Sequence, residues 1–283
     1  MIVTDFDGTL FTDSHTFHKE DIDTLIRLGE TGILRVIATG RSLFSANKVI
    51  PPDFPIDYLV FSSGAGIMEW KRKEIIKAYS LDRYQIKKTS EILINGSFNF
   101  MLHKKIPDNH YFYYIRHTGE DDDFDKRCKI YTEYSIEWDE NEVNEMEEAC
   151  QFVVMISQMD NAAHLSRFTE LKSILGALGN LHVIRATSPL DKKTLWIEIF
   201  PAGVSKAHAI KTIADLKGID YKYIAAVGND FNDLDMLRWA KTSFIVGNAP
   251  LELKNEFVNV KTNNDCGFSD AVKKWMALHD TGR

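Results

Sequence analysis

The sequence has little cysteine, no long apolar run and no excess of basic residues. It contains three cysteines, Cys128, Cys150 and Cys266, an odd number without CxxC spacing. A zinc site or a disulfide framework is therefore not expected, and a reduced, cytoplasmic compartment fits this cysteine usage. No apolar run approaches the ~20 residues that a membrane span needs. The chain reaches an acidic residue almost at once, at Asp5, so we expect neither a membrane segment nor a signal peptide.

The balance of charge is acidic. The chain carries 34 Lys and Arg residues against 41 Asp and Glu residues, a formal net charge of −7. This balance argues against a nucleic-acid partner, which would require a basic patch. It leaves open a small anionic substrate, because a metal ion or a few local cations can reverse the sign of the charge inside one pocket. Nothing in the sequence indicates an oligomeric state.

What the chain does have is an ordinary globular composition, with 44% hydrophobic and 27% charged residues over 283 positions. That composition can bury a sizeable core, and the length favours two parts because a typical domain has ~100–200 residues. Residues 1–4 resemble a buried strand, residues 18–32 an amphipathic helix, and residues 33–39 and 57–66 two further strands. This order predicts a parallel α/β sheet, with ligands at the carboxyl ends of its strands.

The pattern changes after about residue 80 and returns near residue 200. Phe98, Phe100 and Leu102 alternate along one expected strand, as in a half-buried antiparallel sheet. Residues 108–134 fit a strand or a helix at their start, and the acidic run "EDDDFD" within them is most simply a solvated face or a helix N-terminus. The simplest interpretation is one α/β core interrupted by an α+β insertion.

Two strand ends carry residues that suit phosphate chemistry. Asp5 and Asp7 flank Phe6 after the first strand, and residues two apart in an extended segment point the same way. A lone DxD is a weak signal, but the other candidates should lie at the same sheet edge. Thr39 ends the second strand in "ATGRS", where a hydroxyl and backbone N–H groups near a helix start suit a phosphate.

Two later segments supply a cation and more oxygen ligands. Lys206 begins a predicted helix; a lysine there is usually a solvated surface charge, but here it could meet an anion held by the other loops. Asn229, Asp230, Asn232 and Asp233 fill the loop between the strand "YIAAVG" and the next helix. One acidic helix N-terminus is common, whereas four such side chains beside an Asp-x-Asp strand end indicate binding of a hard cation by oxygen ligands.

Together these loops predict a phosphoryl-transfer site that contains Mg²⁺. The metal would be held by Asp5, the backbone carbonyl of Asp7 and the "GND" loop. Asp5 would attack phosphorus and form an aspartyl-phosphate, and Asp7 would act as general acid and then general base. Thr39, Lys206 and Asn232 would stabilise charge on the transferring group.

The four segments resemble the motifs of the haloacid dehalogenase-like superfamily, in order "DFDGTL", "ATGR", Lys206 and "GNDFND". The stretches "IVGNAPLELK" and "NNDCGFSDAV" are similar to its Cof-type subgroup. The resemblance implies a Rossmann-like core, residues 1–80 and 196–283, with a type II α+β cap at 81–195.

The resemblance also assigns roles to individual residues. Asp5 matches the nucleophile and Asp7 the acid/base, with Lys206 as the third catalytic residue. The resemblance also implies a phosphate-binding set and a metal-binding set. These are Gly8, Thr39, Gly40, Arg41, Lys206 and Asn232 for phosphate, and Asp5, Asp7, Asn229, Asp230 and Asp233 for Mg²⁺.

Two positions depart from the family pattern. Asn229 stands where the fourth motif usually has a metal-binding Asp, so weaker Mg²⁺ binding is expected; Asp230 could replace it as the anionic ligand, with Asp233 in support. Ser63 stands where the subgroup often has Asn.

The resemblance implies a phosphatase acting on a small phosphorylated metabolite, with sugar phosphates the first class to consider. A phosphosugar mutase and a catalytically silent binding or regulatory protein are the alternatives. The polar residues of the expected cap that could contact the substrate are His110, Arg116, His117, Arg185 and Lys192.

Overall fold

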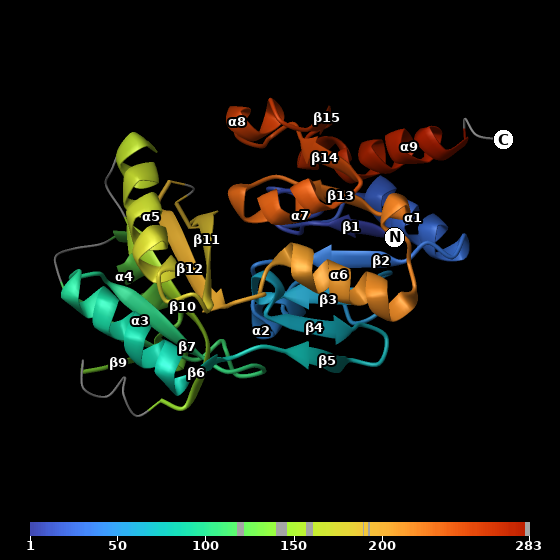
Figure 1. Ribbon diagram of the computed structural model, residues 1–283. Coiled ribbons are helices and arrows are strands. Elements are labelled where there is room, and N and C mark those ends of the chain that lie inside the picture. Colours follow the sequence, from blue (N-terminus) through green and yellow to red (C-terminus); the bar gives the residue numbers. More distant parts are fainter. Residues whose placement is uncertain (118–121, 140–145, 157–160, 189, 192, 281–283) are drawn as a thin grey trace. The chain divides into compact units, whose positions relative to one another are not determined.

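The protein consists of two compact units in a computed structural model that describes residues 1–117, 122–139, 146–156, 161–188, 190–191 and 193–280 (Figure 1). The first unit comprises Met1–Arg41, Ala46–Lys77 and Ser205–Arg283, and the second comprises Ser42–Ser45 and Ala78–Val204. The expected architecture, an α/β core with a parallel sheet and an inserted α+β part, is confirmed.

The sheet of the first unit has, within the described residues, eight strands in the order β15-β14-β13-β1-β2-β3-β4-β5. Strands β15 to β3 in this order run parallel, and β4 is antiparallel to β3. The central strands are short apolar runs that are buried on both faces, as expected for a parallel sheet covered by helices. The strands are β1 (Ile2–Thr4), β2 (Arg35–Ala38), β3 (Tyr58–Phe61), β4 (Gly66–Glu69), β5 (Glu74–Ala78), β13 (Ala225–Gly228), β14 (Thr242–Val246) and β15 (Val258–Val260).

Helices cover both faces of this sheet (Figure 1). On one face, Ile210 and Met236 of two helices pack against Val3 and Val36 of the strands. On the other face, α1 and α9 contact each other, and α9 also contacts β13, β14 and β15. The described helices of the first unit are α1 (Lys19–Glu30), α6 (Lys206–Lys217), α7 (Leu234–Trp239), α8 (Leu251–Lys254) and α9 (Gly267–Asp280). The short helix α2 (Leu43–Asn47) has residues in both units.

The second unit contains a mostly antiparallel sheet, which among the described residues has the order β11-β12-β10-β7-β8-β9 with β6 paired to β10. The predicted alternation is confirmed for Phe100 and Leu102, which pack on one face, while Met101 packs on the other. Phe98, expected on the same strand, precedes it but packs against the same core cluster as Phe100. The strands are β6 (Leu81–Asp82), β7 (Phe100–Lys104), β8 (Phe112–Ile115), β9 (Ser135–Glu137), β10 (Glu148–Ile156), β11 (Leu181–Thr187) and β12 (Leu195–Pro201).

Among the residues that the structure describes, three helices pack on this second sheet: α3 (Arg83–Asn95), α4 (Asp122–Ile130) and α5 (Asn161–Gly176). Ile86 of α3 and Leu171 of α5 belong to the core on the Phe100 face, and Phe124 of α4 belongs to the core on the Met101 face. The segment at 108–134, for which a strand and a helix were both open, contains strand β8 followed by helix α4. None of the helices in the described ranges has the length and apolar character that crossing a bilayer requires.

The limits of the two units differ from the residue numbers expected from sequence. The expected return to the core at residue 196 falls inside β12, which pairs with β10 and β11 of the second sheet. The first unit instead resumes at Ser205, just before α6. Strand β12 is buried along its whole length, so its sequence looks like that of a central core strand.

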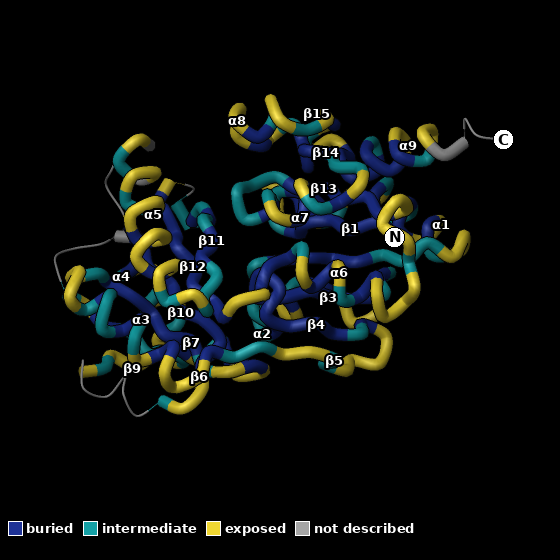
Figure 2. The backbone as a smooth tube through the Cα atoms, in the orientation of Figure 1, coloured by how far each residue is buried: buried dark blue, intermediate teal, exposed yellow. Residues whose placement is uncertain are grey.

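The register of the first sheet brings the candidate residues to one edge. Thr4 of β1 pairs with Ile37 of β2 and with Val227 of β13. Asp5, Thr39 and Asn229 therefore follow their strands at the same carboxyl edge. The strands that lead to this edge are buried, while exposed residues lie mainly on the helices and outer loops (Figure 2).

Candidate active site

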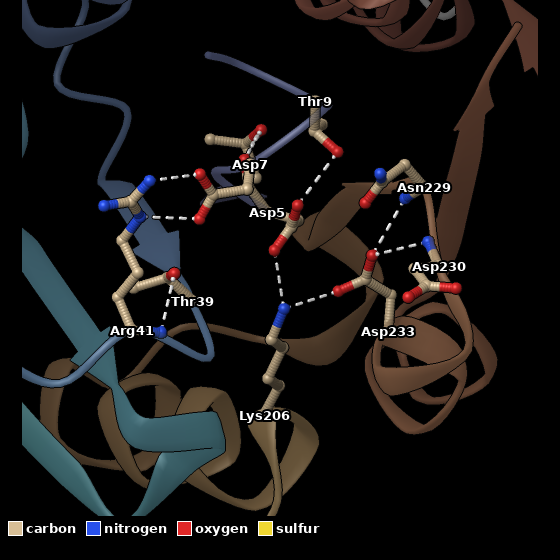
Figure 3. A network of polar contacts seen from close by, with 10 residues as sticks. Asp5, Asp7, Thr9, Thr39, Arg41, Lys206, Asn229, Asp230 and Asp233 are labelled. Atoms are coloured by element: carbon tan, nitrogen blue, oxygen red, sulfur yellow. Dashed lines mark hydrogen bonds and ion pairs between the residues drawn. The ribbon is translucent and has the colours of Figure 1, made fainter. Parts of the chain in front are cut away.

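Three charged side chains from distant parts of the sequence meet at the carboxyl edge of the first sheet (Figure 3). Lys206 Nζ donates hydrogen bonds to Asp5 Oδ1 and Asp233 Oδ1, at 2.6 Å in both cases. The side chains of Lys206 and Asp233 are 0% exposed and that of Asp5 is 6% exposed. Lys206 is therefore not a solvated surface charge; it is a buried cation shared by two carboxylates, which a buried charge needs as partners.

Burial and charge act against each other in this cluster. Burial and then the neighbouring Asp233 carboxylate raise the pKa of Asp5 to about 7, although Lys206 opposes the shift. Burial would lower the pKa of Lys206, but the Asp233 and Asp5 carboxylates together raise it above its ordinary value. The lysine therefore stays charged, and additional positive charge near Asp5 would favour its carboxylate form.

The start of α6 places Lys206 in the cluster. Ser205 precedes the helix, and its hydroxyl accepts a hydrogen bond from the His208 backbone N–H at 3.1 Å, a typical N-cap. The turn η1 (Ser62–Gly64) lies against this point. Gly64 has a φ of 105°, and a Cβ built on it would lie 2.3 Å from the Ser205 carbonyl oxygen. Only glycine allows this close approach.

The turn after β1 fixes the other side of Asp5. Thr9 Oγ1 donates to Asp5 Oδ2 at 3.1 Å, so each oxygen of this carboxylate has one hydrogen-bond donor. Gly8 has a φ of 73°, and a Cβ built on it would lie 2.5 Å from Asn229 Nδ2. The turn therefore needs glycine both for its conformation and for contact with Asn229.

Asp7 is held by the arginine of the "ATGRS" segment. Arg41 Nε donates to Asp7 Oδ2 and Arg41 Nη2 donates to Asp7 Oδ1, each at 2.7 Å. This is a bidentate fork, in which both oxygens of the carboxylate are bound by one guanidinium. The Asp7 side chain is 43% exposed, unlike the buried Asp5. The two acids of the DxD segment therefore have different partners and different solvent access.

The loop after β13 is organised by Asp233. Its Oδ2 accepts hydrogen bonds from the backbone N–H groups of Asn229 at 2.8 Å and Asp230 at 3.1 Å, while its Oδ1 binds Lys206. Asp233 therefore shapes the loop and holds the lysine. The Asn229 side chain lies on the Asp5 side of the loop, and Asp230 lies beyond it (Figure 3).

Thr39, Gly40 and Asn232 lie close together at the same edge. A Cβ built on Gly40 would lie 3.7 Å from Asn232 Nδ2 and 3.5 Å from Ser63 Oγ. Thr39 Oγ1 accepts a hydrogen bond from the Arg41 backbone N–H at 3.1 Å. Ser63 is buried with a φ of 53°, a left-handed conformation that Asn adopts more readily than most residues. This conformation would suit the Asn that the family pattern implies at this position.

The donor set at this edge fits Mg²⁺, which prefers oxygen ligands. Within the described ranges no group of three or more His, Cys, Asp or Glu side chains is arranged to hold a metal ion. Mg²⁺ can, however, use amide and backbone carbonyl oxygens beside a carboxylate. Three groups supply such oxygens: the Asp5 carboxylate, the Asp7 carbonyl and the Asn229 amide. A carboxylate has about four acceptor positions, and the Asn229 amide lies against Gly8.

Two supporting residues were not singled out from the sequence. Thr9 binds Asp5, and its place directly after the Asp-Gly turn was the available signal. Asn248 follows β14; its Nδ2 donates to the Gly8 carbonyl at 2.8 Å and its Oδ1 accepts from the Asn263 backbone N–H at 3.0 Å. Asn248 therefore ties the turn after β1 to the segment before α9.

Three of the candidate substrate contacts, His110, Arg116 and His117, have contacts within the second unit. The His110 ring lies 4.3 Å from the Tyr111 ring, and Arg116 forms an ion pair with Asp125 at 2.5 Å. The His117 backbone N–H donates to Asn99 Oδ1 at 2.8 Å. Arg185 lies on β11, and Lys192 falls outside the described residues.

The described part of the acidic run "EDDDFD", residues 122–125, begins helix α4, as one of the two interpretations predicted, and it contains a buried acceptor. Asp123 is 1% exposed, and its carboxylate accepts hydrogen bonds from Ser188 Oγ at 2.8 Å and Trp196 Nε1 at 2.7 Å. Asp123 therefore joins α4 to β11 and β12, and is not part of a solvated face.

Fold and geometry thus define an α/β protein with a buried Asp–Lys–Asp cluster at the carboxyl edge of a parallel sheet. A family model for haloacid dehalogenase-like hydrolases matches residues 2–272. The chain belongs to this family, as its motifs predicted.

Three distant relatives match nearly the whole chain. The 5-amino-6-(5-phospho-D-ribitylamino)uracil phosphatase YwtE of Bacillus subtilis is 23% identical, covering 93% of both chains. A solved phosphatase of the same superfamily from Bacteroides thetaiotaomicron is 23% identical with a TM-score of 0.75, covering 97% of this chain and 94% of that one. A solved sugar phosphatase of subclass IIB is 18% identical with a TM-score of 0.72, covering 97% and 98%. These structures share the fold of this chain.

Proposed function

We propose that this protein is a Mg²⁺-dependent phosphatase that hydrolyses a small phosphorylated metabolite through an aspartyl-phosphate on Asp5. The observation that carries the proposal is the Asp5 carboxylate, buried at the end of β1 and bound by Lys206 Nζ at 2.6 Å. A buried carboxylate beside a fixed cation suits a nucleophile that must attack an anionic phosphoryl group. The family and the relatives named as phosphatases support the same reaction.

The reaction divides into two displacements at phosphorus. An Asp5 oxygen attacks phosphorus, the bond to the leaving oxygen breaks, and that oxygen takes a proton from Asp7. Water then attacks phosphorus, gives its proton to Asp7, and the bond between phosphorus and Asp5 breaks to release inorganic phosphate. Asp7 is thus unchanged over one turnover, as a general acid/base must be.

The remaining residues of the site would bind the phosphoryl group or Mg²⁺. Lys206, Thr39, Asn232 and the backbone N–H of Gly40 would contact the phosphoryl oxygens as negative charge develops there. The Gly8 N–H, expected in this set, instead donates to the Phe11 carbonyl at 3.2 Å. Asp5, the Asp7 carbonyl and Asn229 would hold Mg²⁺, with Asp230 and Asp233 outside this set. Bound there, Mg²⁺ supplies positive charge that neutralises the phosphate and favours the Asp5 carboxylate.

Sugar or sugar-alcohol phosphates are the first substrate class to test. YwtE is named for a substrate with a phosphorylated ribityl group, and a solved structural neighbour is described as a sugar phosphatase. The cysteines Cys128, Cys150 and Cys266 are free, which supports a cytoplasmic location for an enzyme of small metabolites.

The test is steady-state phosphate release from an aryl phosphate and a panel of sugar phosphates, with Mg²⁺ titrated and Asp5→Asn as the control. Hydrolysis that requires Mg²⁺ and disappears in Asp5→Asn supports the proposal. A wild-type protein that is inert on every ester at high Mg²⁺ contradicts it and favours a binding protein. Transfer of phosphate between positions of one sugar, without release, favours a mutase.

A further inference from the structure

We propose that Arg41 is a positioning residue that acts through Asp7 rather than a ligand of the substrate phosphate. The motif resemblance placed Arg41 in the phosphate-binding set, yet its Nε and Nη2 donate to the two Asp7 oxygens at 2.7 Å each. The inference rests on the proposed phosphatase activity, because it assigns a role within the same site.

The guanidinium of Arg41 is fixed by contacts other than Asp7. Its central carbon lies 5.5 Å from the centre of the Phe6 ring and 6.0 Å from that of Phe11, within the range of cation–π attraction. The two rings stack on each other with centroids 4.8 Å apart. Phe6 lies between Asp5 and Asp7 in sequence, so the same segment that carries both acids also supports the arginine.

The backbone of Arg41 is held as well. Its N–H donates to Thr39 Oγ1 at 3.1 Å, and its carbonyl accepts from the Ser62 N–H at 2.8 Å. A residue fixed at both its backbone and its side chain can orient a partner that is otherwise mobile. Asp7 needs such a partner because its side chain is 43% exposed.

The fork gives Asp7 a defined orientation for proton transfer. A planar guanidinium that binds both oxygens of a carboxylate restricts its rotation more than a single hydrogen bond does. Positioning of this kind affects the rate of proton transfer, and a misplacement of about 1 Å can cost roughly 10²-fold. Arg41 therefore contributes to turnover through the acid/base residue.

A double-mutant cycle with Arg41→Gln and Asp7→Asn separates the two roles. The four proteins are assayed with 4-nitrophenyl phosphate, an aryl ester whose acidic leaving group departs without protonation, and with an alkyl sugar phosphate, whose leaving group needs a proton. We expect Arg41→Gln to lower kcat for the alkyl ester by about 10- to 100-fold, to affect the aryl ester less, and to leave KM nearly unchanged. In the Asp7→Asn background it should have little further effect.

A phosphate-binding Arg41 gives a different pattern. Arg41→Gln would then raise KM and weaken inhibition by inorganic phosphate equally for both esters, and its effect would multiply with that of Asp7→Asn. That result would overturn the inference while leaving the phosphatase proposal intact. A wild-type protein inert on all esters would overturn both. Arg41→Lys serves as a second variant, since it keeps the charge but not the fork and should not restore full kcat.

The chain offers a matched control for loss of an arginine fork. Arg35 binds Asp57 through the same pair of atoms, Nε and Nη2, at 2.9 and 2.8 Å. Arg35 begins β2, at the opposite end of the strand from Arg41. Arg35→Gln should leave kcat, KM and the ratio of alkyl to aryl ester rates unchanged.

The Arg41–Asp7 contact can also be measured without turnover, from the side-chain Nε–H signal of Arg41 in ¹H–¹⁵N NMR spectra, assigned with Arg41→Gln. We expect a slowly exchanging signal that disappears or shifts in Asp7→Asn and persists in Asp5→Asn. Added inorganic phosphate should leave it in place. A signal that ignores Asp7→Asn, or that phosphate displaces, contradicts the inference.

Discussion

The two ends of strand β2 carry the same type of ion pair in different settings. At its amino end Arg35 binds Asp57, and at its carboxyl end Arg41 binds Asp7, both as bidentate forks. The side chains of the first pair are 15% and 30% exposed and those of the second 23% and 43% exposed. Neither the geometry nor the exposure of the pairs separates a structural role from a functional one.

The surroundings of the pairs make the difference. Arg35 also donates to the Leu25 carbonyl of α1 at 3.1 Å, and a Cβ on Gly29 would lie 2.2 Å from Arg35 Nη1. This fork therefore joins a helix to the sheet. The Arg41–Asp7 pair instead lies beside the buried cluster. Asp7 is two residues from Asp5, whose buried carboxylate shares Lys206 with Asp233. Chemistry is expected only at the carboxyl end, and four substitutions test that contrast.

The largest effect is expected for Asp5→Asn. It removes the nucleophile while Lys206 keeps its contact with Asp233, so the fold should survive. Hydrolysis of any phosphate ester should fall by roughly three orders of magnitude or more, with little change in the circular dichroism spectrum. Residual activity close to wild type in a folded protein would show that Asp5 does not form the intermediate.

Lys206→Met should cause the largest loss of stability. The substitution leaves the Asp5 and Asp233 carboxylates buried without their shared cation. Removal of one partner from a buried ion pair lowers the free energy of unfolding by about 3–5 kcal/mol. Urea unfolding of the full chain can measure this loss. Adding Asp233→Asn should recover part of this loss, because it removes one of the two buried charges. An unfolding free energy equal to that of wild type would contradict the burial of an ionised cluster.

Asn229→Asp tests the metal site. A charge in place of a dipole beside Asp5 should strengthen Mg²⁺ binding by about 1 kcal/mol or more, roughly five- to tenfold. Calorimetric titration of Mg²⁺ measures this directly, and the Mg²⁺ concentration for half-maximal hydrolysis should fall in parallel. Asp230→Asn is the matched control and should change Mg²⁺ binding little. The reverse result would make Asp230 the anionic ligand.

Much of the arrangement at the carboxyl edge of the first sheet could be predicted from the sequence. The apolar runs of β1, β2 and β13 are bounded by polar turns, and the parallel arrangement places Asp5, Thr39 and the loop at 229–233 at one edge. Lys206 could be placed there because it lies just after the point where the α/β pattern returns, beyond the long insertion. These predictions depend on the local periodicity of apolar residues and on the order of the motifs. Both can be obtained from a single sequence.

Other features depend on packing that the sequence does not express. The donors of Arg41 suit a phosphate as well as a carboxylate, and only the structure shows them bound to Asp7. Asp233 looked like a metal ligand, yet its oxygens bind Lys206 and two backbone amides. The boundary at residue 196 was misplaced because β12 is buried on both faces, as core strands are.

The smallest effect is expected for Arg35→Gln, the counterpart of the Arg41 substitution. It breaks the fork to Asp57 and the contact with the Leu25 carbonyl. Because both side chains are partly exposed, the unfolding free energy should fall by only about 1 kcal/mol. Thermal unfolding measures the loss, while hydrolysis assays at constant Mg²⁺ should give wild-type kcat and KM. If Arg35→Gln lowered kcat as much as Arg41→Gln, the two forks would be equivalent, and the Arg41 effect would be one of stability rather than of proton transfer.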